Sequence, residues 1–349
     1  MPLTPDSAHV SPGPMTSARI PDGGVALVLS GAVAKGAFSV GALGAFTARG
    51  WSIRRIAATS SGALTAAVLG AGIATGRPQF AAEVAKSLWL DHGAWSDITH
   101  LSWSDWLRAR GLSDTSKLVA LVQEGIQRVV ESAPGGVRAP VKVTLVTSSL
   151  SALPAADDPL PRYELDKDFD ATDFLDSAMW LEIATYAAAS ASFPGLFSPT
   201  IIDGLPCIDG GAVNNAPISC LLDDPQVQTV IVITTESLAS APAPEPSGMA
   251  LVAKLADILI NERIAHDLGM AQRTNTLLRS VTSALDSTGA TAQTRAAVLG
   301  ALGWRDLRLI LVCPDTPLPG TALSAFADRK LREAYIEAGR VAAEKALGG

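Results

Sequence analysis

Short apolar runs recur along the chain, and stretches with helical periodicity separate several of them. The runs are continuous rather than alternating, which is typical of strands that are buried on both faces of a parallel sheet. We expect strands over Val25–Ser30, Ile53–Ala58, Val141–Thr147, Thr229–Thr235 and Leu307–Val312. We expect helices over Lys35–Ala48, from Ser61 onward, over Met249–Ser280 and over Lys330–Leu347. The strand–helix–strand–helix order near the start predicts an α/β fold with a mostly parallel sheet.

Two segments do not fit this pattern of strands and helices. Residues 1–24 contain five prolines and no apolar core, so we expect a flexible tail before a domain that spans 25–349. Residues 237–247 are rich in Ala, Pro and Ser, which favours a surface loop.

Composition narrows the class of protein. The 349 residues are 48% hydrophobic and 17% charged, which is enough to bury a sizeable core and excludes a disordered chain. The net charge of −7 argues against nucleic acid as a partner, because that binding depends on Lys and Arg. The three cysteines, Cys207, Cys220 and Cys313, have no CxxC spacing, so we expect neither a disulfide framework nor a zinc site.

No targeting or membrane segment is evident in the sequence. The first 24 residues lack the apolar stretch of a signal peptide, and no window reaches the roughly 18 apolar residues of a membrane span. We therefore expect a cytoplasmic protein, although an effector secreted without such a signal would show the same features.

The turn Ala58-Thr59-Ser60-Ser61-Gly62 connects a predicted strand to a predicted helix. A serine in such a tight turn projects its hydroxyl above the sheet, and the N-terminus of the following helix favours a developing oxyanion. The simpler interpretation is an ordinary serine that caps the helix.

Two further segments combine glycines with groups that suit catalysis. The loop Gly31–Gly36 (GAVAKG) follows a predicted strand and opens a predicted helix. We expect the backbone N–H groups of such a loop to face a bound anion. The alternative is a simple tight connection between the two elements. Asp209 precedes Gly210 and Gly211, where an aspartate is either a turn residue or a general base.

Taken together and in this order, these motifs make the chain resemble the patatin-like phospholipase family over roughly residues 25–345. Gly31–Gly36 resembles the oxyanion loop of the family, Ala58–Gly62 its GxSxG elbow, and Asp209–Gly211 its Asp-Gly-Gly motif. A fourth segment, Ala189–Pro199 (ASASFPGLFSP), resembles the run that precedes that aspartate.

The resemblance implies a three-layer α/β/α fold and a serine lipid acyl hydrolase of the phospholipase A or lysophospholipase type. Ser60 would be the nucleophile, and Asp209 would accept its proton without a histidine. The N–H groups around Ala32 and Val33 would bind the oxyanion, and Lys35 would shape the loop or favour an anionic headgroup. The family needs no metal or organic cofactor. The implied partner is a lipid or another acyl ester, and contact with a membrane surface is compatible with that substrate.

Departures from the family pattern leave alternatives open. Ala32, Val33 and Ala58 stand where glycines are usual, so a catalytically weak or inactive lipid-binding relative is one alternative. A valine in the loop must either adopt ordinary dihedrals or be strained.

Two further alternatives rest on residues outside these motifs. A Ser60–Asp209–His266 triad is an alternative because His266 follows Asp209 in the chain order of α/β-hydrolases. Trp95, Trp103 and Trp106 either touch a membrane or pack over the sheet.

Overall fold

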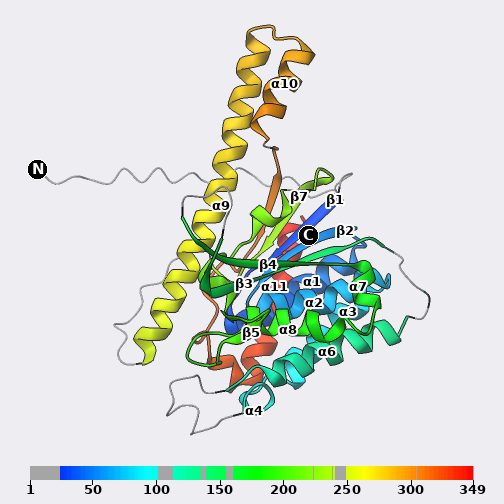
Figure 1. The fold of residues 1–349 in the computed structure, drawn as a ribbon, viewed down its shortest axis with the longest axis vertical. Helices are drawn as coiled ribbons and strands as arrows, with labels where there is room; N and C mark the ends of the chain where they lie inside the picture. The colour runs from blue at the N-terminus through cyan, green and yellow to red at the C-terminus, as the bar shows by residue number, and fades with distance from the viewer. Residues whose placement is uncertain are drawn as a thin grey trace, which may run out of the picture.

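A sheet of eight strands forms the centre of the computed structural model, with helices on both sides (Figure 1). The structure describes residues 24–100, 113–133, 135, 139–154, 160–222, 224–237, 239, 249–303 and 305–348. The strands are β1 Gly24–Leu29, β2 Ile53–Thr59, β3 Lys142–Leu153, β4 Arg162–Asp170, β5 Thr200–Ile202, β6 Leu205–Ile208, β7 Val227–Ile233 and β8 Arg308–Val312.

Helices separate most of these strands along the chain, singly or in groups. The α-helices are α1 Ala37–Ala48, α2 Ser61–Ala74, α3 Pro78–Asp91, α4 Trp95–Ile98, α6 Ser116–Glu131, α7 Ala171–Leu175, α8 Trp180–Ser190, α9 Met249–Ser287, α10 Ala292–Leu302 and α11 Arg329–Ala346. The described residues also form four short 3-10 helices: η1 Val33–Gly36, η2 Gly210–Ala212, η3 Ile218–Leu221 and η4 Ser324–Phe326.

The central strands run in the order β3-β2-β1-β7-β8, and all of their pairings are parallel. Three antiparallel strands, β4, β5 and β6, extend the sheet beyond β3. This arrangement confirms the expected α/β class with a mostly parallel sheet.

Successive residues of the central strands point to opposite faces, as the pleat requires. On β1, Val25, Leu27 and Leu29 belong to a core that contains residues of α1, α2, α8 and α11. The intervening Ala26 and Val28 belong to a second core, formed with η3 and α9. The sheet therefore lies between two helical layers, which explains why its strands are continuous apolar runs.

The expected strands and helices are present, with ends shifted by a few residues. The helix expected over Lys35–Ala48 begins as the 3-10 turn η1 and continues as α1. The expectations for residues 1–24 fall almost entirely outside the described residues, as do those for 237–247. The antiparallel strands were not predicted; β4 (RYELDKDFD) is a mostly exposed strand with little apolar signal.

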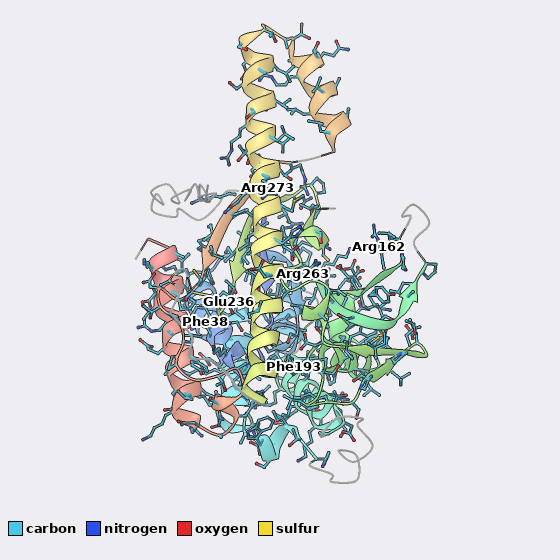
Figure 2. All side chains as sticks on the ribbon, turned by 90° about the vertical axis from the view of Figure 1, so that its left-hand side faces the viewer. Phe38, Arg162, Phe193, Glu236, Arg263 and Arg273 are labelled. Atoms are coloured by element: carbon cyan, nitrogen blue, oxygen red, sulfur yellow. The ribbon has the colours of Figure 1, made fainter. Side chains whose placement is uncertain are left out.

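Helix α9 is longer than expected, with 39 residues against the predicted stretch to Ser280. Its middle part, which includes Arg263, lies against the sheet, and its far end forms a hairpin with α10 that projects from the body (Figures 1 and 2). No residue of α10 is buried. Among the helices that the structure describes, none is both long and apolar enough to cross a membrane.

Helices α1 and α11 approach each other so closely that glycines are required at their contact. A Cβ atom at Gly41 of α1 would overlap the carbonyl oxygen of Ile336, and one at Gly339 of α11 would overlap that of Phe38. Helix α1 begins directly after the loop that carries Gly31 and Gly36, so this contact holds that loop in place.

We predict that Gly41→Ala lowers the free energy of unfolding by about 1–3 kcal/mol or more, because the added methyl group meets backbone atoms. Gly44→Ala on the same helix is the matched control, since a Cβ atom there meets nothing within 4 Å. The control should be neutral or stabilising by up to about 1 kcal/mol, from helix propensity alone. Urea unfolding compares the two variants, and equal stabilities would contradict the account of this contact.

Candidate active site

Three loops meet at one edge of the sheet. The loop 31–36 follows β1, and Ser60 lies in the turn between β2 and α2. Because β1 and β2 are parallel neighbours, their carboxyl ends share this edge. The third loop, 209–215, follows β6, which pairs with the end of β3 beside β2.

Ser60 has a backbone conformation that side chains other than glycine rarely adopt, with φ 54° and ψ −134°. Its N–H donates a hydrogen bond to Ser190 Oγ at 2.7 Å. Its side chain makes no capping hydrogen bond to α2, so the simple helix-cap interpretation does not describe this serine. The geometry is that of a strained strand-to-helix elbow, which exposes the hydroxyl above the sheet.

The residues around Ser60 fit this tight turn. A Cβ atom at Gly62 would overlap the carbonyl oxygen of Leu29, so a glycine is required there. Ala58, which stands where the family pattern has glycine, is fully buried and its methyl group belongs to the main core. Thr59 is also fully buried, on the same strand. The methyl group of Ala58 is thus accommodated by core packing.

Asp209 lies beside the hydroxyl of Ser60. Ser60 Oγ donates to Asp209 Oδ2 at 2.7 Å, and the Gly211 N–H donates to Asp209 Oδ1 at 2.8 Å. Both carboxylate oxygens are therefore engaged, and the orientation of the carboxylate is fixed. The pair brings together two of the residues that the sequence singled out, across 149 positions of the chain.

Burial raises the pKa of the Asp209 carboxyl to about 6, because a charge is disfavoured away from water. The hydrogen bonds from Ser60 and Gly211 oppose this effect by stabilising the ionised form. The carboxylate is therefore a stronger base than an exposed aspartate, yet it is ionised at neutral pH.

Backbone and serine contacts hold Asp209 in place. The Asp209 N–H donates to Ser192 O at 3.1 Å, and its carbonyl oxygen accepts from Ser148 Oγ at 2.8 Å. Gly210 lies so close to β2 and β3 that a Cβ atom would overlap Val146 O. Ser148 and Ser192 were not singled out from the sequence, although Ser192 lies in the segment Ala189–Pro199 that resembles the family.

The loop 31–36 packs directly against both serines of the elbow. A Cβ atom at Gly31 would overlap Ser60, and one at Gly36 would fall 2.5 Å from Ser61 Oγ. Glycine is thus retained at the two positions of the loop where the approach of a serine leaves no space for a side chain.

The positions between these glycines carry larger residues. The Ala32 N–H, expected to face the oxyanion, donates to Ser61 Oγ at 3.0 Å. Val33 has a φ of 49°, a conformation that costs a β-branched residue roughly 1–3 kcal/mol. Its N–H has no acceptor among the described residues. Lys35 is half-buried.

A side-chain clamp joins this loop to the loop of Asp209. Asn215 Oδ1 accepts from the Gly31 N–H at 3.0 Å, and Asn215 Nδ2 donates to Gly31 O at 3.4 Å. Asn215 is fully buried, so both of its polar groups are paired with the same glycine. Asn215 was not among the site residues predicted from the sequence, because its role depends on a contact across 184 positions of the chain.

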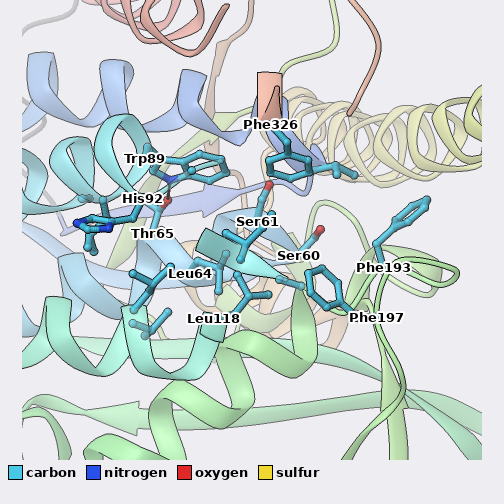
Figure 3. Close-up of a pocket in the computed structure, with 18 of the residues that line it drawn as sticks. Ser60, Ser61, Leu64, Thr65, Trp89, His92, Leu118, Phe193, Phe197 and Phe326 are labelled. Atoms are coloured by element: carbon cyan, nitrogen blue, oxygen red, sulfur yellow. Dashed lines mark hydrogen bonds between the residues drawn. The ribbon is translucent and has the colours of Figure 1, made fainter. Parts of the chain in front are cut away.

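A cavity extends from Ser60 and Asp209 between α2, α3 and α6. With its opening to solvent it contains about 780 Å³ of empty space. Its walls are almost entirely apolar, as Figure 3 shows for one side of Ser60. Its apolar lining residues include Leu64, Val68, Leu88, Trp89, Ile98, Leu118, Val122, Phe193, Phe197 and Phe326.

Among the residues that the structure describes, no hydrogen bond joins Ser60 to the other residues considered from the sequence. His266 is on α9, with a side chain 63% exposed, and it pairs with Asp267 at 3.3 Å rather than with Asp209. Trp95 is half-buried against Phe326, with ring centroids 4.9 Å apart. Trp103 and Trp106 lie outside the described residues. The three cysteines are free thiols. No group of ligands that would suit a metal ion occurs in the described part of the chain.

Comparisons with known proteins agree with the sequence motifs. The model of the family described as "Patatin-like phospholipase" matches residues 27–222, which include every motif residue discussed above. No curated protein sequence matches the chain significantly.

Two solved structures are similar to the chain at low sequence identity. VipD from Legionella pneumophila has 13% identity and a TM-score of 0.40, over 94% of this chain and 67% of that one. ExoU from the type III secretion system of Pseudomonas aeruginosa, solved with SpcU, has 17% identity and a TM-score of 0.31, over 90% and 70%. The family match alone covers more than half of the chain, and it shows that the protein belongs to the patatin-like phospholipase family.

Proposed function

We propose that the protein is a serine lipid acyl hydrolase of the phospholipase A or lysophospholipase type that uses Ser60 and Asp209 as a catalytic dyad. The observation that supports this most directly is the 2.7 Å hydrogen bond from Ser60 Oγ to Asp209 Oδ2 at the end of an apolar cavity. Membership of the patatin-like phospholipase family supports lipid acyl hydrolysis as the general activity.

In the first half of the proposed reaction, Ser60 Oγ attacks the acyl carbonyl carbon while its proton passes to Asp209 Oδ2. The carbonyl oxygen becomes an oxyanion, which needs hydrogen-bond donors. We assign this role to the Val33 N–H, which has no acceptor among the described residues, and to the N-terminus of α2. Collapse of the intermediate expels the alcohol, which takes the proton from Asp209 and leaves an acyl-enzyme.

In the second half, a water molecule attacks the acyl-enzyme and gives its proton to Asp209. The bond between the acyl group and Ser60 Oγ then breaks and the fatty acid is released. Ser60 takes the proton back from Asp209. The Gly211 N–H keeps Asp209 Oδ1 engaged throughout, so Oδ2 faces Ser60 in both halves. The apolar walls of the cavity suit an acyl chain and exclude bulk water from the carboxylate.

We predict that Ser60→Ala and Asp209→Asn each abolish hydrolysis of p-nitrophenyl esters and of a phospholipid. The loss should be at least about 10³-fold for Ser60→Ala, and about 10²–10⁴-fold for Asp209→Asn, because Asn cannot accept the proton. His266→Asn is the matched control and should keep most activity, since the exposed imidazole contacts neither residue of the dyad. A comparable loss in His266→Asn would favour the triad, and a folded wild type without turnover would favour a lipid-binding relative.

The pH dependence of kcat/KM should follow the ionisation of Asp209. Only the ionised carboxylate accepts the Ser60 proton, so activity should rise through an apparent pKa of about 6 and level off above it. Below that pKa, activity should fall about tenfold for each pH unit. The profile is measured with an uncharged ester, and a midpoint near the ordinary pKa of an exposed aspartate would contradict this assignment.

Asp209→Asn should also stabilise the fold at neutral pH. The pKa of Asp209 is raised from 3.8, the value of an exposed aspartate, to about 6 in the folded protein. Ionising Asp209 therefore lowers the free energy of unfolding, progressively as the pH rises from about 4 to 6. Asn is neutral at every pH and avoids this cost, which is on the order of 1–3 kcal/mol above pH 6. Thermal unfolding should therefore show a gain in Tm near pH 7 that shrinks towards pH 4. A gain that is constant with pH would mean that the charge of Asp209 is not its cause.

A further inference from the structure

Val33 combines a strained backbone with a large side chain in the loop that borders Ser60. Three described residues other than glycine have a positive φ: Val33, Ser60 and Asp203. Asp203 lies in the short turn between β5 and β6, where such a conformation is common for Asp. Val33 is β-branched, the type of side chain for which this conformation is least favourable.

The contacts on both sides of Val33 prevent the loop from relaxing. The Ala32 N–H is bonded to Ser61 Oγ, and the Ala34 N–H is bonded to Ala322 O at 3.0 Å. Gly31 and Gly36 are fixed by their close packing against Ser60 and Ser61. The strain at Val33 is therefore maintained by the surrounding structure, which is how strained residues persist at functional sites.

The isopropyl group of Val33 occupies space in the site itself. Val33 is 7% exposed, and it lines the same cavity as Ser60, Asp209 and Phe326. A glycine at this position would leave that space empty and would carry no strain. Away from Ser60 the cavity is lined by apolar side chains from three helices, among them Leu64, Leu118 and Trp89 (Figure 3). Apolar walls of this kind suit a hydrocarbon chain.

We propose that Val33 is a specificity-determining residue that restricts the site to acyl chains that are unbranched near the carbonyl carbon. Its isopropyl group narrows the cavity beside Ser60, so a substituent on the first carbons of the acyl chain competes with it for space. This inference rests on the proposed function, because it concerns the acyl group that Ser60 would receive. It assigns a linear acyl ester as the substrate class.

The size of the effect follows from how apolar walls discriminate between substrates. One methylene group in or out of a well-packed pocket changes kcat/KM by about 10–200-fold. The two methyl groups of Val33 should therefore change the preference for linear over branched chains by at least about tenfold.

The experiment compares kcat/KM for p-nitrophenyl hexanoate and p-nitrophenyl 2-ethylhexanoate in wild type, Val33→Ala, Val33→Gly and Val33→Thr. The ratio of the two values within one enzyme does not depend on how much of that enzyme is folded. Val33→Ala removes the bulk but keeps a side chain at the positive φ, Val33→Gly removes both bulk and strain, and Val33→Thr keeps the branched shape.

We expect the linear-to-branched ratio to fall at least about tenfold in both Val33→Ala and Val33→Gly, through a gain on the branched ester. Val33→Thr should keep the wild-type ratio. An unchanged ratio in Val33→Ala and Val33→Gly would overturn the inference, as would a change in Val33→Gly alone, since that would point to strain rather than bulk.

Failure of the proposed function has a different signature. In that case the wild type would show no hydrolysis of either ester beyond that of Ser60→Ala, and the inference about Val33 would fall with it. Turnover that depends on Ser60, together with an unaltered ratio in the variants, would overturn the role of Val33 and leave the proposed function standing.

Discussion

The hydrogen bond between Ser60 and Asp209 depends on the exact approach of loops that are far apart in the sequence, and the rest of the site is arranged around it. Ser190 anchors the backbone of Ser60, while Ser148 and Ser192 anchor the backbone of Asp209. Because all five residues are buried, each polar contact is made away from competing water. The same burial raises the pKa of Asp209, so the packing that shields the Ser60–Asp209 pair from water also makes the carboxylate more basic.

Glycine occurs in this site where a backbone segment or a serine lies directly against the glycine. It is not present at every position where the family pattern has it. Gly31, Gly62 and Gly210 each lie against atoms that would overlap a Cβ atom. Ala58 stands at a position where the core accepts a methyl group. Val33 stands where the family pattern has glycine, and its backbone is strained. Its side chain lies at the cavity beside Ser60, so we expect it to affect which acyl chains fit.

The sequence was sufficient to predict the central strands and the three motif loops, but not that the loop of Asp209 joins the other two at one edge of the sheet. Apolar runs report burial on both faces, and parallel strands bring their carboxyl ends together. Strand β4 was missed because its charged sequence carries little apolar signal, and its place depends on pairing with β3. The clamp formed by Asn215 depends on an approach of distant loops that no local pattern encodes. The domain extent of 25–349 and the catalytic roles of the site residues stay predictions.

The most direct test of the account is to identify the residue that reacts with a fluorophosphonate, by mass spectrometry of peptides from the folded protein. The phosphorus centre takes the place of the acyl carbonyl, so it reacts with a serine only when the serine is activated as a nucleophile. The account predicts one adduct, on Ser60, and much slower labelling in Asp209→Asn. A folded wild type that stays unlabelled, or that carries the adduct on another residue such as Ser61, would contradict it.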